Sequence, residues 1–192
     1  HGSKPLALGG LLAFLTLIPG AAAALVVSCR YDCARDRRTL LVIATLTMEI
    51  LGYVCYWLNY FSVYLGNIFS WLVVGASTAA AVWSAKSIDG REALKRLVGP
   101  LTLVMVVFYT YFSAGLLYGA GHDPLEVARV RYASVLPGDN RLPLAVATYI
   151  LEGDVPRPMV DGWYSSDRPP LQSGIYLLYL PLSKMLGLKT VA

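Results

Sequence analysis

The stretch from Gly138 to Gln172 reads GDNRLPLAVATYILEGDVPRPMVDGWYSSDRPPLQ, and the rest of the chain is arranged around it. It follows a series of apolar segments and runs directly into another one. It carries five acidic and three basic side chains: Asp139, Glu152, Asp154, Asp161, Asp167, Arg141, Arg157 and Arg168. A stretch this charged, between two segments apolar enough for a bilayer, is expected to lie at a membrane surface.

The composition favours a membrane protein. Of 192 residues, 56% are hydrophobic and 15% are charged, whereas soluble domains carry about 25% charged residues. The apolar residues occur in blocks rather than in periodic stripes, which predicts an all-α polytopic membrane protein with about five transmembrane helices. The net charge of +4 does not indicate nucleic-acid binding, because the basic residues lie mostly in short loops between apolar blocks. The three cysteines show no metal-ligand spacing with histidine.

The blocks divide the chain as follows. Residues 1–3 resemble the remnant of a purification tag and are left out of the fold prediction. Residues 4–118 are predicted to hold four transmembrane spans, at about 6–27, 40–57, 63–83 and 97–118. Residues 119–170 form a long polar loop with amphipathic helices, and residues 171–192 hold a fifth span that reaches about residue 188. We expect the chain to be a truncated part of a longer protein.

The charges between the spans predict an orientation. Arginine and lysine are concentrated in the first and third connections and are missing from the second. Short basic loops stay in the cytoplasm, so the long polar loop is expected on the periplasmic or extracytoplasmic side of an inner (plasma) membrane. Tyrosine and tryptophan gather near the span ends, as interfacial anchors do.

Glu49 lies inside the second predicted span. An acidic group at that depth is a candidate functional residue. The structural alternative is a protonated or partnered glutamate that contacts Thr45, Thr47 or another helix.

Two helices are predicted in the polar loop. Asp123 and Pro124 begin a short interfacial helix at 125–133. A second helix covers 142–151 and ends at Gly153, with Asp139 or Asn140 as its cap. Residues 155–166 are expected to form an ordered loop. Taken alone, Asp139 is better explained by capping than by catalysis, and Arg168 also fits an interfacial arginine at the head of a membrane helix.

The order of these elements resembles the first outer loop of the GT-C glycosyltransferases, which include the protein O-mannosyltransferases and the aminoarabinose transferases of lipid A. In that family an Asp-Glu pair precedes an amphipathic helix that ends in glycine. A proline-containing loop follows, and a Lys/Arg-Pro-Pro-Leu motif opens the next span. Here the sequence has Asp139-Asn140, then RLPLAVATYILEG, then VPRPMVDGWYSS, then Asp167-Arg168-Pro169-Pro170-Leu171.

The resemblance implies a function and its residues. A sugar would pass from a polyprenyl-phosphate donor to an extracytoplasmic glycan, lipid or protein acceptor. Asp139 matches the essential acid, as general base or metal contact, and Arg168 matches the residue that meets the lipid-linked phosphate. Supporting roles fall to Asn140, Arg141, Tyr164 and Asp167. No metal ligand set is predicted, and a divalent metal at Asp139 is left open because Asn140 stands where the family often has glutamate.

The family is several hundred residues long and uses a second outer-loop acid beyond the spans seen here. We therefore expect the remaining half of the enzyme to be part of the same or another chain, and this part not to catalyse transfer alone. Two alternatives come from other classes. One is a non-catalytic membrane subunit or assembly partner, and the other is a small transporter that uses Glu49.

Overall fold

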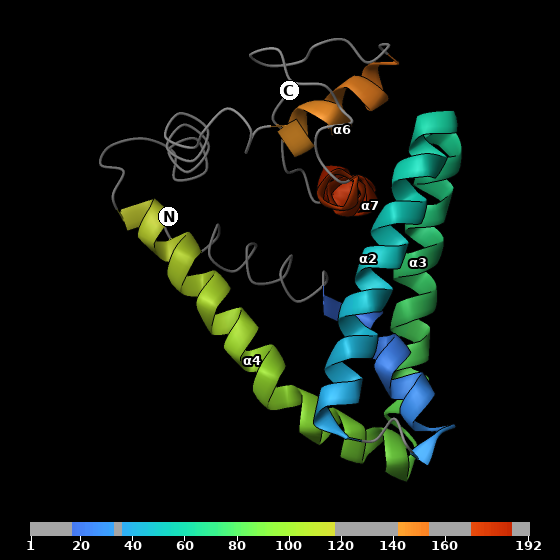
Figure 1. The fold of residues 1–192 in the computed structure, drawn as a ribbon, viewed down its shortest axis with the longest axis vertical. Helices are drawn as coiled ribbons and strands as arrows, with labels where there is room; N and C mark the ends of the chain where they lie inside the picture. The colour runs from blue at the N-terminus through green and yellow to red at the C-terminus, as the bar shows by residue number, and fades with distance from the viewer. Residues whose placement is uncertain (1–16, 33–35, 118–141, 154–169, 186–192) are drawn as a thin grey trace.

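The computed structural model describes residues 17–32, 36–117, 142–153 and 170–185, and the regular structure in these ranges is helical. This agrees with the predicted all-α fold. The labelled helices are α2, α3, α4, α6 and α7, and they are preceded by an apolar helical segment, Leu17–Ser28 (Figure 1).

Helices α2 (Arg37–Phe61) and α3 (Val63–Ser84) form an antiparallel hairpin in which they lie side by side (Figure 1). Asp36 caps α2 by accepting hydrogen bonds from the backbone N–H groups of Arg38 and Thr39. A single extended residue, Ser62, separates the two helices, and its hydroxyl oxygen accepts from the N–H of Leu65 at 3.4 Å. The connection between the spans predicted at 40–57 and 63–83 is therefore shorter than expected, because Ser62 both ends α2 and caps α3.

Within the described residues, α2 and α3 are the two helices long and apolar enough to cross a membrane. Only 22% of the most apolar stretch of α2 and 17% of that of α3 is buried inside the protein. The predicted spans at 40–57 and 63–83 thus coincide with these helices. The predicted total of five spans is not supported by the described residues, in which Leu17–Ser28 and Leu171–Leu182 are shorter apolar helices. Residues 6–16 of the first predicted span lie outside the described ranges.

Helix α4 (Ile88–Leu117) begins well before the span predicted at 97–118. The hydroxyl oxygen of Ser87 accepts a hydrogen bond from the N–H of Gly90 at 2.9 Å, as a helix cap does. Ala93 and Leu97 are buried one turn apart, while the charged residues between them are exposed. The basic loop expected at 85–96 is therefore largely the first turns of an amphipathic helix, since its charges occupy one face and its apolar residues another.

Helix α6 (Leu142–Glu152) confirms the helix predicted at 142–151. Gly153 follows it with φ 74°, a left-handed conformation in which glycine is the natural helix terminator. Helix α7 (Leu171–Met185) begins where the fifth span was expected. However, α7 is seen end-on in Figure 1 while α2 and α3 run upright, so α7 crosses the hairpin instead of lying along it. The predicted helix at 125–133 lies outside the described residues.

The main core surrounds α7. It is formed by Cys55, Tyr56, Val73, Val146, Ala147, Leu177, Leu178, Tyr179, Leu180 and Leu182, from α2, α3, α6 and α7. A second core joins the segment Leu17–Ser28 to the starts of α2 and α4, through Ala24, Leu25, Leu40, Ala93 and Leu97. Helix α4 leans away from the hairpin beyond this contact (Figure 1).

Candidate functional site at the starts of helices α6 and α7

The sequence-predicted site residues in the polar loop are not among those described by the structure: Asp139, Asn140, Arg141, Tyr164, Asp167 and Arg168. The structure does describe the two helices that directly follow their motifs. Helix α6 begins at Leu142, right after Asp139-Asn140-Arg141, and α7 begins at Leu171, right after Asp167-Arg168-Pro169-Pro170. The geometry of these two helix starts is therefore the framework on which the predicted site depends.

The two helix starts are joined by a hydrogen bond. The hydroxyl of Ser173, in the first turn of α7, donates to the carbonyl oxygen of Pro143, in the first turn of α6, at 2.8 Å. Ser173 is buried, at 2% exposure, and neighbouring Leu142 is also buried, at 1%. A buried hydroxyl that lost this acceptor would remain desolvated without a partner, so the bond favours one arrangement of the two starts.

Helix α7 begins with an intrahelical bond from the N–H of Gly174 to the carbonyl of Pro170, at 2.8 Å. The backbone N–H groups of the first turn have no such acceptor, and they give the start of a helix a partial positive charge. The starts of α6 and α7 thus bring two electropositive helix ends together beside the Ser173–Pro143 bond.

Helix α7 is held against α2 by direct backbone contact between two glycines. A Cβ added to Gly174 would lie 1.9 Å from the carbonyl oxygen of Gly52. A Cβ added to Gly52 would lie 2.9 Å from Cγ1 of Ile175. Small residues allow this close approach of helices, so the Gly52–Gly174 crossing fixes where the first turn of α7 lies.

Glu49 is half-buried on α2, and it is not part of the α6–α7 contact core. No hydrogen bond or ion pair joins it to Thr45, Thr47 or another residue in the described ranges. Those ranges also contain no group of three histidine, cysteine or acidic side chains able to hold a metal ion. A protonated, half-buried glutamate is one of the two sequence interpretations, and a functional role for Glu49 stays a prediction.

A buried polar cluster between α2 and α3 was missed by the sequence analysis. The side-chain amide of Asn59 donates to the carbonyl of Cys55 at 2.9 Å. On α3, the hydroxyl of Ser70 donates to the carbonyl of Gly66 at 3.0 Å, and it lies 3.7 Å from Sγ of Cys55. The sequence does contain a signal for this cluster. Each helix has a pair of small or polar residues four positions apart, Cys55 and Asn59 on α2 and Gly66 and Ser70 on α3. The cluster joins two apolar helices through polar contacts, which is a structural role.

Charged groups gather at the end of the hairpin where α2 and α4 begin. Nε of Arg37 donates to the carbonyl of Arg96 at 3.4 Å. The hydrogen bond from the Thr39 hydroxyl, with further bonds from the N–H groups of Thr39 and Arg38, lowers the pKa of Asp36. The Lys95 ammonium, 2.8 Å from the Glu92 carboxylate, lowers the pKa of Glu92. Asp36 and Glu92 are therefore stabilised in their ionised forms by neighbouring donors and cations.

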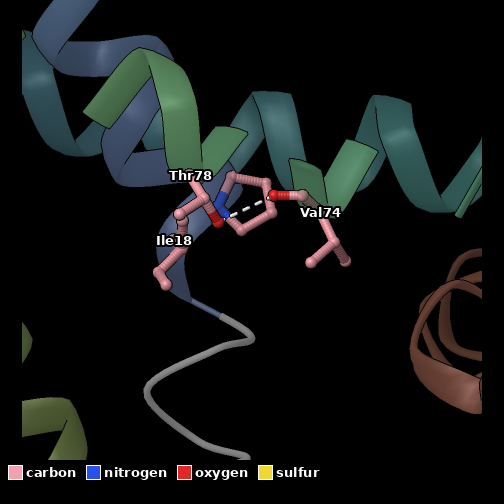
Figure 2. Close-up of a pocket in the computed structure, with 4 residues that line it drawn as sticks. Ile18, Val74 and Thr78 are labelled. Atoms are coloured by element: carbon pink, nitrogen blue, oxygen red, sulfur yellow. Dashed lines mark hydrogen bonds between the residues drawn. The ribbon is translucent and has the colours of Figure 1, made fainter. Parts of the chain in front are cut away.

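The hollows between the described helices include a shallow one and a larger apolar one. Figure 2 shows a shallow one, in which Ile18 and Pro19 face Val74 and Thr78 of α3, and the Thr78 hydroxyl donates to the Val74 carbonyl at 2.8 Å. It has no room for a water molecule. The other is an apolar cavity of about 340 Å³ between the segment Leu17–Ser28, Ala81 of α3, and α4. Neither hollow is lined by residues of α6 or α7.

The chain was compared with family models, with curated proteins and with solved structures, and none of the three comparisons gave a match.

Proposed function

We propose that this chain is part of a GT-C type membrane glycosyltransferase, which transfers a sugar from a polyprenyl-phosphate donor to an extracytoplasmic acceptor. The observation that supports this proposal most directly is the Ser173–Pro143 hydrogen bond between the starts of α6 and α7. These are the two helices that follow the acidic and the basic motif of the polar loop.

Chain length links the helix starts to the proposed site. Asp139 is three residues before Leu142, and Arg168 is three residues before Leu171. An extended chain spans at most about 3.6 Å per residue. The backbone of Asp139 is therefore at most about 11 Å from the start of α6, and the backbone of Arg168 at most about 11 Å from the start of α7. Because those starts are in contact, both groups are able to reach one substrate.

The proposed chemistry is a direct displacement. The acceptor hydroxyl oxygen forms a bond to the anomeric carbon of the sugar, and the bond from that carbon to the phosphate oxygen breaks. The phosphate leaves with the bonding electron pair, and the Arg168 guanidinium binds it through paired hydrogen bonds. The Asp139 carboxylate accepts the proton of the acceptor hydroxyl. The electropositive starts of α6 and α7 favour the developing phosphate charge.

The proposal includes a multi-pass topology in an inner (plasma) membrane. Helices α2 and α3 cross the bilayer, and α4 and the segment that ends at Ser28 cross beside them. The basic end that holds Arg37, Lys86 and Arg91 faces the cytoplasm. Helix α7 then lies across the hairpin on its outer half, nearer the Phe61 end than the Arg37 end, as seen in Figure 1. Phosphatase reporters fused after Lys86 should be inactive and those fused after residue 118 active, and the reverse pattern would reject this orientation.

The proposed partners are the bilayer, the lipid-linked sugar, the acceptor, and the remaining half of the enzyme in the same or another chain. A divalent metal at Asp139 remains compatible with this scheme, since a carboxylate is a suitable ligand.

The test uses the full-length protein in native membranes, supplied with a panel of radiolabelled polyprenyl-phosphate sugars. Asp139→Asn and Arg168→Ala should each lower transfer by about a hundredfold or more, because each removes a group that acts in the transition state. Asp161→Asn and Arg157→Ala remove the same charges from the same loop and serve as matched controls that keep transfer. Size-exclusion chromatography in detergent checks that all four variants are folded. If Asp139→Asn and Arg168→Ala both transfer at the wild-type rate, the chain is not this enzyme, and a non-catalytic membrane subunit becomes the better hypothesis.

A further inference from the structure

The apolar cavity between the segment Leu17–Ser28 and α4 has a shape and a lining suited to a hydrocarbon chain. It measures about 340 Å³, and the described residues that line it are apolar except for the side chain of Thr102: Leu17, Ile18, Ala21, Leu25, Ala81, Leu94, Val98, Leu101, Thr102 and Met105. The α4 part of the lining extends from Leu94 to Met105, which is about 16 Å along the helix axis at 1.5 Å per residue. One leaflet of a bilayer is about 15 Å deep, so the cavity matches one acyl chain in length.

One end of this cavity meets the basic end of the protein. Leu25 and Leu94 line it there, and the chain beyond Leu25 is tied to the start of α4 by the contact between Sγ of Cys29 and Oγ of Ser87, at 3.2 Å. The opposite end is lined by Leu17, Ile18 and Met105. The cavity therefore runs from the basic end of the protein toward the middle of the hairpin.

Arg91 continues the helix face that lines the cavity. It precedes Leu94 by three residues and Val98 by seven, which places all three on one side of α4. Arg91 is exposed, and within the described part of the chain its guanidinium makes one hydrogen bond, from Nε to the carbonyl of Ser87 at 3.3 Å. Lys95 is near the same side, but Glu92 binds its ammonium. An apolar stripe that ends in an available guanidinium complements a molecule with a hydrocarbon tail and an anionic head.

We propose that this cavity is a binding site for an anionic phospholipid of the leaflet at the basic end, with one acyl chain along Leu94, Val98 and Met105 and the phosphate at Arg91. The inference rests on α2 and α3 lying in a membrane and does not depend on the transferase activity.

The test measures which lipids stay bound to the purified full-length protein by native mass spectrometry. The two probes are dioleoyl phosphatidylglycerol and dioleoyl phosphatidylcholine, which share their tails and differ in net charge. The wild type should retain the anionic lipid in preference. Arg91→Gln should reduce that preference about fivefold, the effect of one basic residue near an anionic headgroup. Arg96→Gln is the matched control, because five residues along the helix place Arg96 on the other side of α4.

A second pair of variants tests the cavity itself. Val98→Trp fills the space and should release both lipids, whereas Val104→Trp adds the same bulk at an exposed position outside the lining and should not. Equal retention of the two lipids by the wild type would overturn the proposal, and so would equal losses in Arg91→Gln and Arg96→Gln, or unchanged retention in Val98→Trp. If Val98→Trp does not fold, the comparison of Arg91→Gln with Arg96→Gln still tests the proposal.

Discussion

Helices α2 and α3 on one side, and α7 on the other, bury their apolar residues in opposite ways. The hairpin helices are the longest described candidates for membrane spans, yet only 22% of the most apolar stretch of α2 and 17% of that of α3 is buried inside the protein. Helix α7 has only 15 residues, and Leu177, Leu178, Tyr179 and Leu180 are all buried in consecutive positions. The shorter helix forms the interior, and the longer ones form the surface.

This difference supports the proposal that the hairpin surface meets lipid. In water, an apolar face of this size would associate or aggregate, whereas in a bilayer lipid chains cover it at no cost. The interior is then defined by close contact and polar bonds rather than by hydrophobicity, since lipid is as apolar as leucine. The Gly52–Gly174 crossing and the Ser173–Pro143 bond are such contacts, and they hold the framework of the proposed site.

The largest effect is expected from adding a side chain where α7 crosses α2, at the Gly52–Gly174 contact. Gly174→Leu should prevent α7 from docking on α2 and abolish the folded state, because even a Cβ there would lie 1.9 Å from the Gly52 carbonyl oxygen. Gly75→Leu is the control, since a Cβ at Gly75 on α3 meets no atom within 4 Å. Unfolding by SDS titration in micelles compares the two. Equal stability of both variants would contradict the crossing.

A pair of leucine truncations compares interior and surface directly. Leu178 is 0% exposed on α7, and Leu72 is 64% exposed on α3. Leu178→Ala should lower the free energy of unfolding by about 3 kcal/mol, whereas Leu72→Ala should change it by about 0.5 kcal/mol or less. The same SDS titration measures both. A larger loss for Leu72→Ala would mean that α3 is covered by protein.

A charge on the hairpin tests whether its outer face meets lipid or water. Leu72→Lys places an ammonium near the middle of α3, which should disfavour membrane insertion by about 2.5 kcal/mol. In water an exposed lysine would be harmless. Glycosylation-tagged insertion assays in microsomes measure the fraction of α3 that spans, and wild-type insertion of Leu72→Lys would argue against a lipid-facing α3.

The smallest expected effect is at the cap of α2. The pKa of Asp36 is lowered below 3.8 by its bonds to Thr39 and Arg38, so its contribution to stability is present above that pH and is lost as the pH falls through the lowered value. Asp36→Asn keeps a capping oxygen without the charge. The wild type should melt slightly higher than Asp36→Asn at pH 7, and the margin should shrink at a pH well below 3.8, as the pH falls through the lowered pKa of Asp36. A margin that is the same at both pH values would exclude the carboxylate as its source.

The sequence predicted the helices better than their arrangement. The apolar blocks located α2 and α3, and Gly153 located the end of α6, because length, apolarity and a glycine terminator act within one segment. The early start of α4 was missed, since its charged residues suggested a loop although they occupy one exposed helix face. The predicted site could be traced only to its two flanking helices, and the roles of Asp139 and Arg168 stay predictions.

What the sequence by itself determined is the helical class, the two apolar helices of the hairpin and the basic character of the end where α2 begins, because these follow from local composition. Only the tertiary structure decided that α7 crosses the hairpin, that Gly52 and Gly174 meet, and that Ser173 binds Pro143. Each of these depends on residues that are far apart in the chain and close together in space. The pattern of residues within one segment does not indicate which other segment it will contact.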